Sequence, residues 1–398
     1  MLKVTDIARA HLIAGDVDEP HESLVKLLAA LGEHSADYLA LSLAEPDVQA
    51  FLGLVLGFAG LQGYFGQDEE VSDLVIPFWS DFQEALTASP CVHTSSRPRT
   101  LQLSGQGSRL TASLSRSARH IETADAEPPS AEWQVAQSVF FELVRRLLRK
   151  VTLPADGGAS WLADQRDRFK SYRFELGDCL VTSFYVLRRP LLGFFHGQLV
   201  ERLIGPSSAG QPVAWHEVEA VLHALRCVRE AVPTDEAEIL PFVFSPEVLS
   251  RLPSEGQQRV RLTAVSLIGD YASWLHLHPA FVPGAVELLV PALSVPALCV
   301  EAAKSLKRVC DLCRHRLTGH VGPLAGLYDQ IAERIEPEEK AKVLEAVVSV
   351  VQALPPAEAV APVLVSPISR SKGLLCRSAA DKRPSSTVHH DSDRREAL

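Results

Sequence analysis

The chain has 398 residues, of which 46% are apolar and 22% are charged, and its formal net charge is −10. This composition is ordinary for a soluble globular protein, and the excess of acid disfavours general nucleic-acid binding, which needs a basic face. Aromatic residues make up only 7% while Leu, Ala and Val are abundant. That balance favours helices over sheets and basic proteins as partners.

The amino-terminal part is predicted to be helical, because apolar residues recur at three- and four-residue intervals between stop signals. No stretch alternates apolar and polar residues long enough to predict a strand. A proline at position 190 should end or kink the last helix of this part. The expected helices span residues 22–43, 46–64, 70–86, 131–151 and 161–189.

Residues 48–64 form the most apolar run, VQAFLGLVLGFAGLQGY, in which Gly53 and Gly57 have the spacing that lets two membrane helices approach closely. The run is about as short as a membrane span can be, contains glutamines and is flanked by acids. We therefore favour a helix buried in a large protein, with the glycines admitting a neighbour, and expect no membrane partner.

The carboxy-terminal half shows a repeat in the positions of its long helices, which are expected to begin at 213, 256, 296 and 337. The intervals of 43, 40 and 41 residues lie close to the period of HEAT and armadillo repeats, roughly 40–47 residues. Shorter partner helices are expected between them, and Asp235 and Glu238 should cap the first. The predicted fold class is all-α, an α-solenoid of antiparallel helix pairs (HEAT/armadillo-like repeats).

Two segments do not fit this pattern. Residues 90–130 are rich in Ser and Arg, and residues 366–398 have a similar composition. Disorder explains both, and so would retained non-coding sequence in the gene model. The predicted organisation is therefore HEAT-like repeats over 1–89, a disordered insert over 90–130, HEAT-like repeats over 131–365 and a disordered tail over 366–398.

The cysteines were considered as a disulfide framework and as a metal site. Seven of them are scattered along the chain, which favours a reducing compartment, cytosol or nucleus, over disulfides. Cys310 and Cys313, followed by His315 and His320, resemble half of a zinc site. Because the two cysteines would share one helix face, packing as small apolar groups in the core is the favoured interpretation, with a metal or redox role as the alternative.

The acidic run Asp68-Glu69-Glu70, with Asp73, opens an expected helix, where acids offset the positive end of the helix dipole. A contact for a basic partner is the alternative role. We find no phosphate-binding loop, no zinc-protease motif and no nucleophile elbow. The sequence therefore predicts no enzyme, with no catalytic, cofactor-binding or metal-binding residues and no cofactor.

Several short runs, taken in their order along the chain, carry a resemblance to a known family. They are Asp68–Leu74 with Pro77-Phe78-Trp79; Leu148-Arg149-Lys150-Val151; Trp161, Asp164, Phe169, Tyr172-Arg173 and Asp178; Trp215–Ala220; Arg261, Thr263 and Ala264; Gly269 to Trp274; and Ala302-Ala303, Ser305-Leu306 leading to Cys310. The order of these runs resembles the transportin-3 and importin-13 branch of the importin-β superfamily, in its central part.

The resemblance implies a nuclear transport receptor that binds cargo proteins and Phe-Gly-rich nucleoporins and shuttles between nucleus and cytoplasm, importing protein into the nucleus. It also implies the GTPase Ran as a partner. The amino-terminal repeats that bind Ran in the family have no match here, so we do not expect this chain alone to bind Ran. The alternative is a cytosolic HEAT-repeat scaffold of a multiprotein complex.

Overall fold

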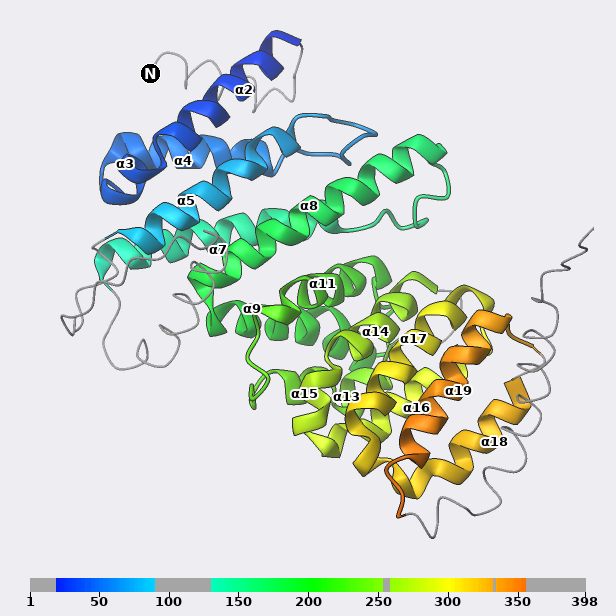
Figure 1. Cartoon of the computed structure of the whole chain (residues 1–398). Helices are drawn as coiled ribbons and strands as arrows, with labels where there is room; N and C mark the ends of the chain where they lie inside the picture. Colours follow the sequence, from blue (N-terminus) through cyan, green and yellow to red (C-terminus); the bar gives the residue numbers. More distant parts are fainter. Residues whose placement is uncertain (1–18, 90–129, 253–257, 332–333, 356–398) are drawn as a thin grey trace, which may run out of the picture. The chain divides into compact units, whose positions relative to one another are not determined.

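The computed structural model describes residues 19–89, 130–252, 258–331 and 334–355, which form helices joined by turns (Figure 1). No β-strand occurs in these ranges, where a single isolated bridge joins Phe65 and Glu69. The all-α prediction is confirmed. The segments expected to be disordered, 90–130 and 366–398, lie outside the described residues except for Ser130.

The chain divides into two compact units between Leu288 and Leu289. The helices of the first unit are α2 (Glu19–His34), α3 (Ala36–Leu41), α4 (Pro46–Ala59), α5 (Ile76–Ala88), α7 (Ala131–Val151), α8 (Ala163–Leu187), α9 (Arg189–Leu199), α10 (Gly205–Ser208), α11 (Trp215–Cys227), α12 (Leu240–Val243), α13 (Pro246–Leu249), α14 (Gln258–Asp270) and α15 (Ala272–Leu277). Short 3-10 or π turns add η1 (Ser72–Val75), η3 (Val200–Ile204), η4 (Val228–Glu230) and η5 (Pro279–Phe281). The organisation drawn from the sequence, with repeats over 1–89 and 131–365, stays a proposal.

Helix α16 (Val282–Ala292) spans the division between the units. The second unit contains α17 (Pro296–Cys313), η6 (Arg314–Arg316), η7 (Thr318–His320), α18 (Val321–Ile331) and α19 (Pro337–Val351). Within it, α17 packs along α19, and α18 packs on α19 as well.

In the first unit the helices pack in two layers. Helices α2, α5 and α8 lie one beside the next, while α4 packs on α7 in the layer behind them (Figure 1). Helix α8 then contacts α11, and α11 packs along α14. Each of these helices therefore packs on the helix that lies about one repeat further along the chain, as expected of a helical repeat protein.

The core between α5 and α7 is aromatic. Phe78, Trp79 and Phe82 of α5 and Phe140 of α7 are all fully buried. The rings of Phe82 and Phe140 are stacked with their centroids 6.0 Å apart, and Trp79 meets Phe140 edge-on at 5.8 Å. Truncating a buried ring of this kind to alanine typically costs about 3–5 kcal/mol.

The amino-terminal helices follow the predicted ones with differences at their ends. Helix α7 has the predicted bounds, and its first turn is capped by the Ser130 hydroxyl, which accepts a hydrogen bond from the Trp133 amide at 3.1 Å. The helix expected over 22–43 breaks at Ser35 into α2 and α3, and that over 46–64 ends at Ala59. The sequence predicted no helix between 190 and 212, where α9 lies.

The helix expected over 161–189 ends at Leu187, because Arg188 adopts a positive φ of 54°. Pro190 then falls in the first turn of α9, where a proline is tolerated. It therefore starts a helix there and does not kink one.

The four long helices of the predicted repeat are present, beginning at Trp215, Gln258, Pro296 and Pro337, within two residues of the expected positions. The cap predicted at Asp235 is wrong. The Glu236 carboxylate instead accepts hydrogen bonds from the amides of residues 238, 239 and 240, at 3.0, 2.9 and 2.6 Å.

The apolar run 48–64 forms a largely buried helix, α4, as predicted. In the described ranges no helix is both long and apolar enough to cross a membrane. The role expected for Gly53 is wrong, because a Cβ atom placed there would meet no atom within 4 Å. The close approach occurs instead at Gly32 of α2, where a Cβ atom would lie 2.8 Å from the Phe78 ring.

Candidate protein-binding site

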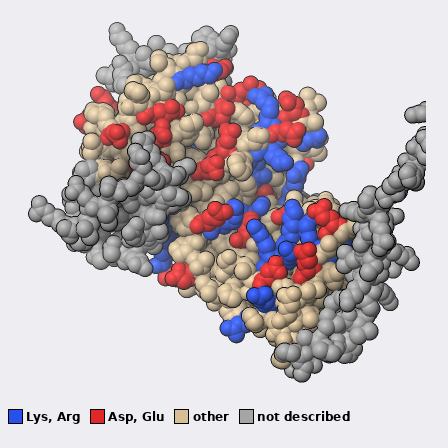
Figure 2. All heavy atoms as spheres, in the orientation of Figure 1, with Lys and Arg blue, Asp and Glu red and all other residues tan. Residues whose placement is uncertain are grey.

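Acidic residues are concentrated at the amino-terminal end of the described chain. Between residues 19 and 89 the sequence contains twelve Asp and Glu residues, a single lysine, Lys26, and no arginine. Figure 2 shows these acidic side chains spread over α2–α5, while Lys and Arg gather over α8 and the helices that follow. Such an imbalance creates a negative potential that attracts cationic partners.

Two of these acids face each other across neighbouring helices. Glu33 lies on α2 and Asp81 on α5, and these helices pack side by side. Burial raises the pKa of the Glu33 carboxyl, and the nearby charge of Asp81 raises it further. Like charges held close together by the fold disfavour ionisation, so a cation placed between them would relieve the repulsion.

A second facing pair joins η1 to α8. Burial raises the pKa of Asp73 to about 6, and the carboxylates of Glu175 on α8 and Glu69 add to the effect. Its Oδ1 atom is buried and has no hydrogen-bond partner among the described residues. Asp178 follows Glu175 by one turn of α8 and is exposed. We call Glu33, Asp73, Asp81, Glu175 and Asp178 the acidic face.

Glu69, in the acidic run singled out from the sequence, has a structural role. Its carboxylate accepts hydrogen bonds from the amides of Val71 and Ser72, both at 2.9 Å, and from the Ser72 hydroxyl at 2.6 Å. The Lys150 ammonium on α7 lies 2.6 Å away, and both side chains are at least nine-tenths buried. The acid therefore sits at the amino-terminal end of a helical segment, as predicted, and is inaccessible to a partner.

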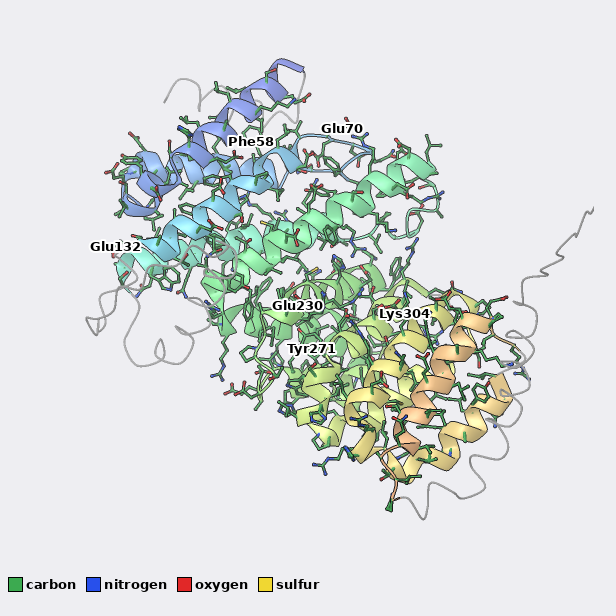
Figure 3. The ribbon with its side chains drawn as sticks, viewed as in Figure 1. Phe58, Glu70, Glu132, Glu230, Tyr271 and Lys304 are labelled. Carbon is green, nitrogen blue, oxygen red and sulfur yellow. The ribbon has the colours of Figure 1, made fainter. Side chains whose placement is uncertain are left out.

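Glu70 and Asp68 are exposed, but each has a partner within the chain. Glu70 forms an ion pair with Arg168 of α8, and Figure 3 shows Glu70 in the segment between α4 and α5. The Asp68 carboxylate accepts a hydrogen bond from the Tyr64 amide at 2.8 Å. Of the acids singled out from the sequence, Asp73 is thus the one that belongs to the acidic face.

Buried and half-buried ion pairs link the next helices. The Arg173 guanidinium on α8 donates two hydrogen bonds to Glu219 on α11, at 3.1 and 2.8 Å. Glu219 also accepts a hydrogen bond from the Thr263 hydroxyl on α14 at 2.8 Å. Arg226 of α11 pairs with Asp270 of α14 at 3.0 Å. Several of the short runs that carried the family resemblance therefore supply residues that connect successive helix pairs.

The Cys310 and Cys313 thiols are buried inside the second unit, as the core interpretation predicted. Burial raises the pKa of Cys310 to about 12 and that of Cys313 to about 11, which keeps both thiols protonated and unreactive. His315 and His320 are exposed. Among the described residues no group of three or more His, Cys, Asp or Glu side chains could hold a metal ion.

Glu33, Asp81, Glu175 and Asp178 were not identified from the sequence as site residues. The charge imbalance of residues 19–89 is a signal that could have indicated the acids of α2 and α5. The pairing of particular carboxylates depends on which helices lie side by side, which the sequence pattern does not specify.

Comparison with known proteins gives three matches to related proteins. Residues 237–327 match the third TPR domain of the transportin-3/importin-13 family. Importin-13 of Bos taurus is 23% identical over 335 residues, which cover 83% of this chain and 30% of the relative. Transportin MOS14 of Arabidopsis thaliana is 24% identical over 358 residues, covering 87% of this chain and 33% of the relative. The chain is similar to proteins of the transportin-3/importin-13 family.

The chain spans about a third of the length of these family members. A solved structure of importin-13 in its cytosolic state superimposes with a TM-score of 0.73 at 20% identity, covering 96% of this chain and 40% of the other. This likeness confirms the HEAT-repeat fold. Although the matched family model is described as a TPR domain, helix pairs that begin about 40 residues apart have the HEAT period.

The similarity to importin-13 bears out the prediction that the chain is not an enzyme. The importin-13 match also agrees with the resemblance seen in the sequence. In both cases the chain corresponds to only a part of a longer receptor.

Proposed function

We propose that this chain is a nuclear transport receptor of the karyopherin type, or a part of one, whose acidic face binds basic segments of cargo proteins. The observation that carries the proposal is the pairing of like charges between α2 and α5 and between η1 and α8. A folded protein gains nothing from such repulsion, whereas a cationic partner converts it into attraction. The family matches support transport as the context.

The remaining family partners are part of the same proposal. Phe-Gly-rich nucleoporins would carry the chain through the nuclear pore, and it would shuttle between nucleus and cytoplasm as it imports protein. Ran would regulate the full-length receptor, while this chain alone is not proposed to bind it. A stack of helix pairs suits such a role, because small rotations per repeat add up to a change of curvature that can grip or release cargo.

The test of cargo binding uses the full chain and a fluorescein-labelled Lys/Arg-rich peptide, followed by fluorescence anisotropy. The variant Glu33→Gln/Asp81→Asn/Glu175→Gln removes three charges of the acidic face. At about 0.5 kcal/mol for each partly screened charge pair, we expect the affinity to fall about tenfold. Raising the salt concentration should weaken wild-type binding in the same direction.

The matched control is Glu201→Gln/Glu230→Gln/Glu247→Gln, which changes the net charge equally at exposed positions outside the acidic face. Glu230, for example, is 83% exposed at the end of η4. If the control weakens binding as much as the acidic-face variant, the attraction depends on net charge alone and the proposed site is wrong.

Transport itself is tested in permeabilised cells with the fluorescent full chain. Accumulation at the nuclear rim, and retention on an immobilised Phe-Gly-rich nucleoporin fragment, are the expected results. The alternative function, a cytosolic HEAT-repeat scaffold, predicts neither result and instead a stable non-nuclear partner that co-purifies with the chain.

A further inference from the structure

Helix α2 carries apolar residues on two sides. It packs on α5, and its Val25 and Leu28 are almost fully buried. Leu24, Leu27 and Leu31 lie on a second side, where spacings of three and four residues place them one turn after another. Leu27 is 63% exposed, and the other two are half-buried. We call Leu24, Leu27 and Leu31 the leucine stripe.

The leucine stripe is open in the described part of the chain. Helix α2 is the outermost helix of the layer formed by α2, α5 and α8 (Figure 1), and its contacts with α3, α4 and η1 leave Leu27 exposed. One exposed leucine is normal on a protein surface, whereas a helix that is apolar on more than one side is normally buried between neighbours. The stripe is therefore a surface on which a further apolar segment can dock.

The segment directly before α2 has the apolar pattern that such a surface requires. Residues 1–18 lie outside the described ranges and join α2 at Glu19. Within residues 1–14, Lys3 and Arg9 outnumber the single acid, and the acidic stretch 19–89 attracts such a segment. Its apolar residues recur at the intervals that predict one apolar side of a helix: Val4, Ile7, Ala8 and Leu12.

The connection between this segment and α2 is short. Gly15 is a typical helix stop and Asp18 is a typical N-cap for α2, so residues 15–18 connect the two. Connections of about two to five residues join antiparallel helices that lie side by side. A helix over residues 3–14 would be about 18 Å long. Counting away from the connection on both sides brings Ile7 opposite Leu27.

We propose that residues 3–14 dock on the leucine stripe as a helix antiparallel to α2, with Ile7 against Leu27. This contact is independent of cargo binding. It covers the outer side of α2 and leaves Glu33 free for a partner, because Glu33 follows Leu31 by two residues and so points to another side of the helix. The occupant of the stripe is thus part of this chain, and not a second copy or a separate protein.

Hydrogen exchange of the full chain, followed by mass spectrometry, tests the contact. A helix of about twelve residues is marginal alone in water, so the amides of residues 3–14 are protected only if the segment docks. In wild type they should exchange about a hundredfold more slowly than in an unfolded chain. Leu27→Ala should speed their exchange about tenfold, because the docked segment then covers a smaller apolar side chain. Unprotected amides in wild type would overturn the inference.

Leu162→Ala is the matched control, because Leu162 is 71% exposed at the start of α8 and lies outside the leucine stripe. It should leave the exchange of residues 3–14 at the wild-type rate. If Leu27→Ala changes that exchange no more than Leu162→Ala does, the segment does not dock on the stripe. Exchange in α8 should stay within about twofold of wild type in Leu27→Ala, and a loss of protection that extends through α8 would also contradict a local contact.

A double-mutant cycle tests the pairing of Ile7 with Leu27. Ile7→Ala should speed the exchange of residues 3–14 about tenfold. The variant Ile7→Ala/Leu27→Ala should lose less than the product of the two single effects, as expected for side chains in contact. Effects that simply multiply would show that the two residues do not meet. Light scattering over a range of concentrations tests the other occupant, and a wild-type dimer that Leu27→Ala dissociates would show that a second copy covers the stripe.

Discussion

Replacing Lys150 by methionine should destabilise the segment that joins α4 to α5. The ammonium donates hydrogen bonds to the Glu69 carboxylate at 2.6 Å and to the carbonyls of Leu61 and Gly63 at 3.2 and 2.8 Å. Those contacts use all three of its donor positions. Its loss leaves a buried carboxylate without a counter-charge, which typically costs about 3–5 kcal/mol.

Native-state hydrogen exchange measures this cost locally. The amides of Val71 and Ser72 donate to Glu69, so their protection reports whether the segment stays closed. A loss of about 3–5 kcal/mol should speed their exchange by about a hundredfold or more. Adding Glu69→Gln to Lys150→Met should recover part of the protection, because the unpaired charge is then gone.

The matched control is Lys26→Met. Lys26 pairs with Glu22 on the surface of α2, where the two side chains are 56% and 40% exposed, and such pairs contribute about 0.3–0.5 kcal/mol. If Lys150→Met and Lys26→Met change the exchange of Val71 and Ser72 by similar factors, the buried pair does not hold this segment in place.

Two glycine substitutions should change the free energy of unfolding in urea in opposite directions. Gly32→Ala should lower it by about 1–3 kcal/mol, because the added Cβ atom clashes with the buried Phe78 ring. Gly53→Ala should raise it by about 0.5–1 kcal/mol, because the added Cβ atom on α4 lies in open space. A loss of stability at both positions would contradict the close approach assigned to Gly32. Asp73→Asn should stabilise the protein at neutral pH. Burial and the nearby carboxylates raise the pKa of Asp73 in the fold to about 6, well above the ordinary value for aspartate, so ionised Asp73 is disfavoured there. The stabilisation by protonated Asp73 is fully present below about pH 4 and is lost as the pH rises through 6. The urea midpoints of Asp73→Asn and wild type should therefore diverge as the pH rises across that range. A difference between the two midpoints that stays constant with pH would refute the raised pKa of Asp73.

Hydrophobic periodicity predicted the helices well where local signals agree with packing. Helix α7 has a serine cap, an unbroken apolar stripe and basic residues in its last turn, and its bounds were predicted to the residue. The break at Tyr271 between α14 and α15 has no proline to mark it, and Gly269 before it lies inside α14. Its phenol donates a hydrogen bond to the Leu225 carbonyl at 2.9 Å, a tertiary contact that the local sequence does not reveal.

The candidate site was less predictable than the fold. The acidic run 68–70 was identified, but the structure uses Glu69 and Glu70 internally and leaves Asp73 to the face. The charged residues of a sequence indicate whether a surface is acidic or basic. Which of those residues lie opposite one another is decided by the packing of helices that are far apart in the chain. The pairing of Glu33 with Asp81 is of that second kind.

Glu236 places a limit on how this chain can evolve. Its carboxylate holds the amides that lead into α12, and its own carbonyl accepts a hydrogen bond from the Trp274 indole at 2.7 Å. Inserting or deleting a single residue between α11 and α12 would misplace one of these two contacts. The spacing of these repeats is therefore fixed by the geometry of one turn, and length variation among relatives should be tolerated in other turns before this one.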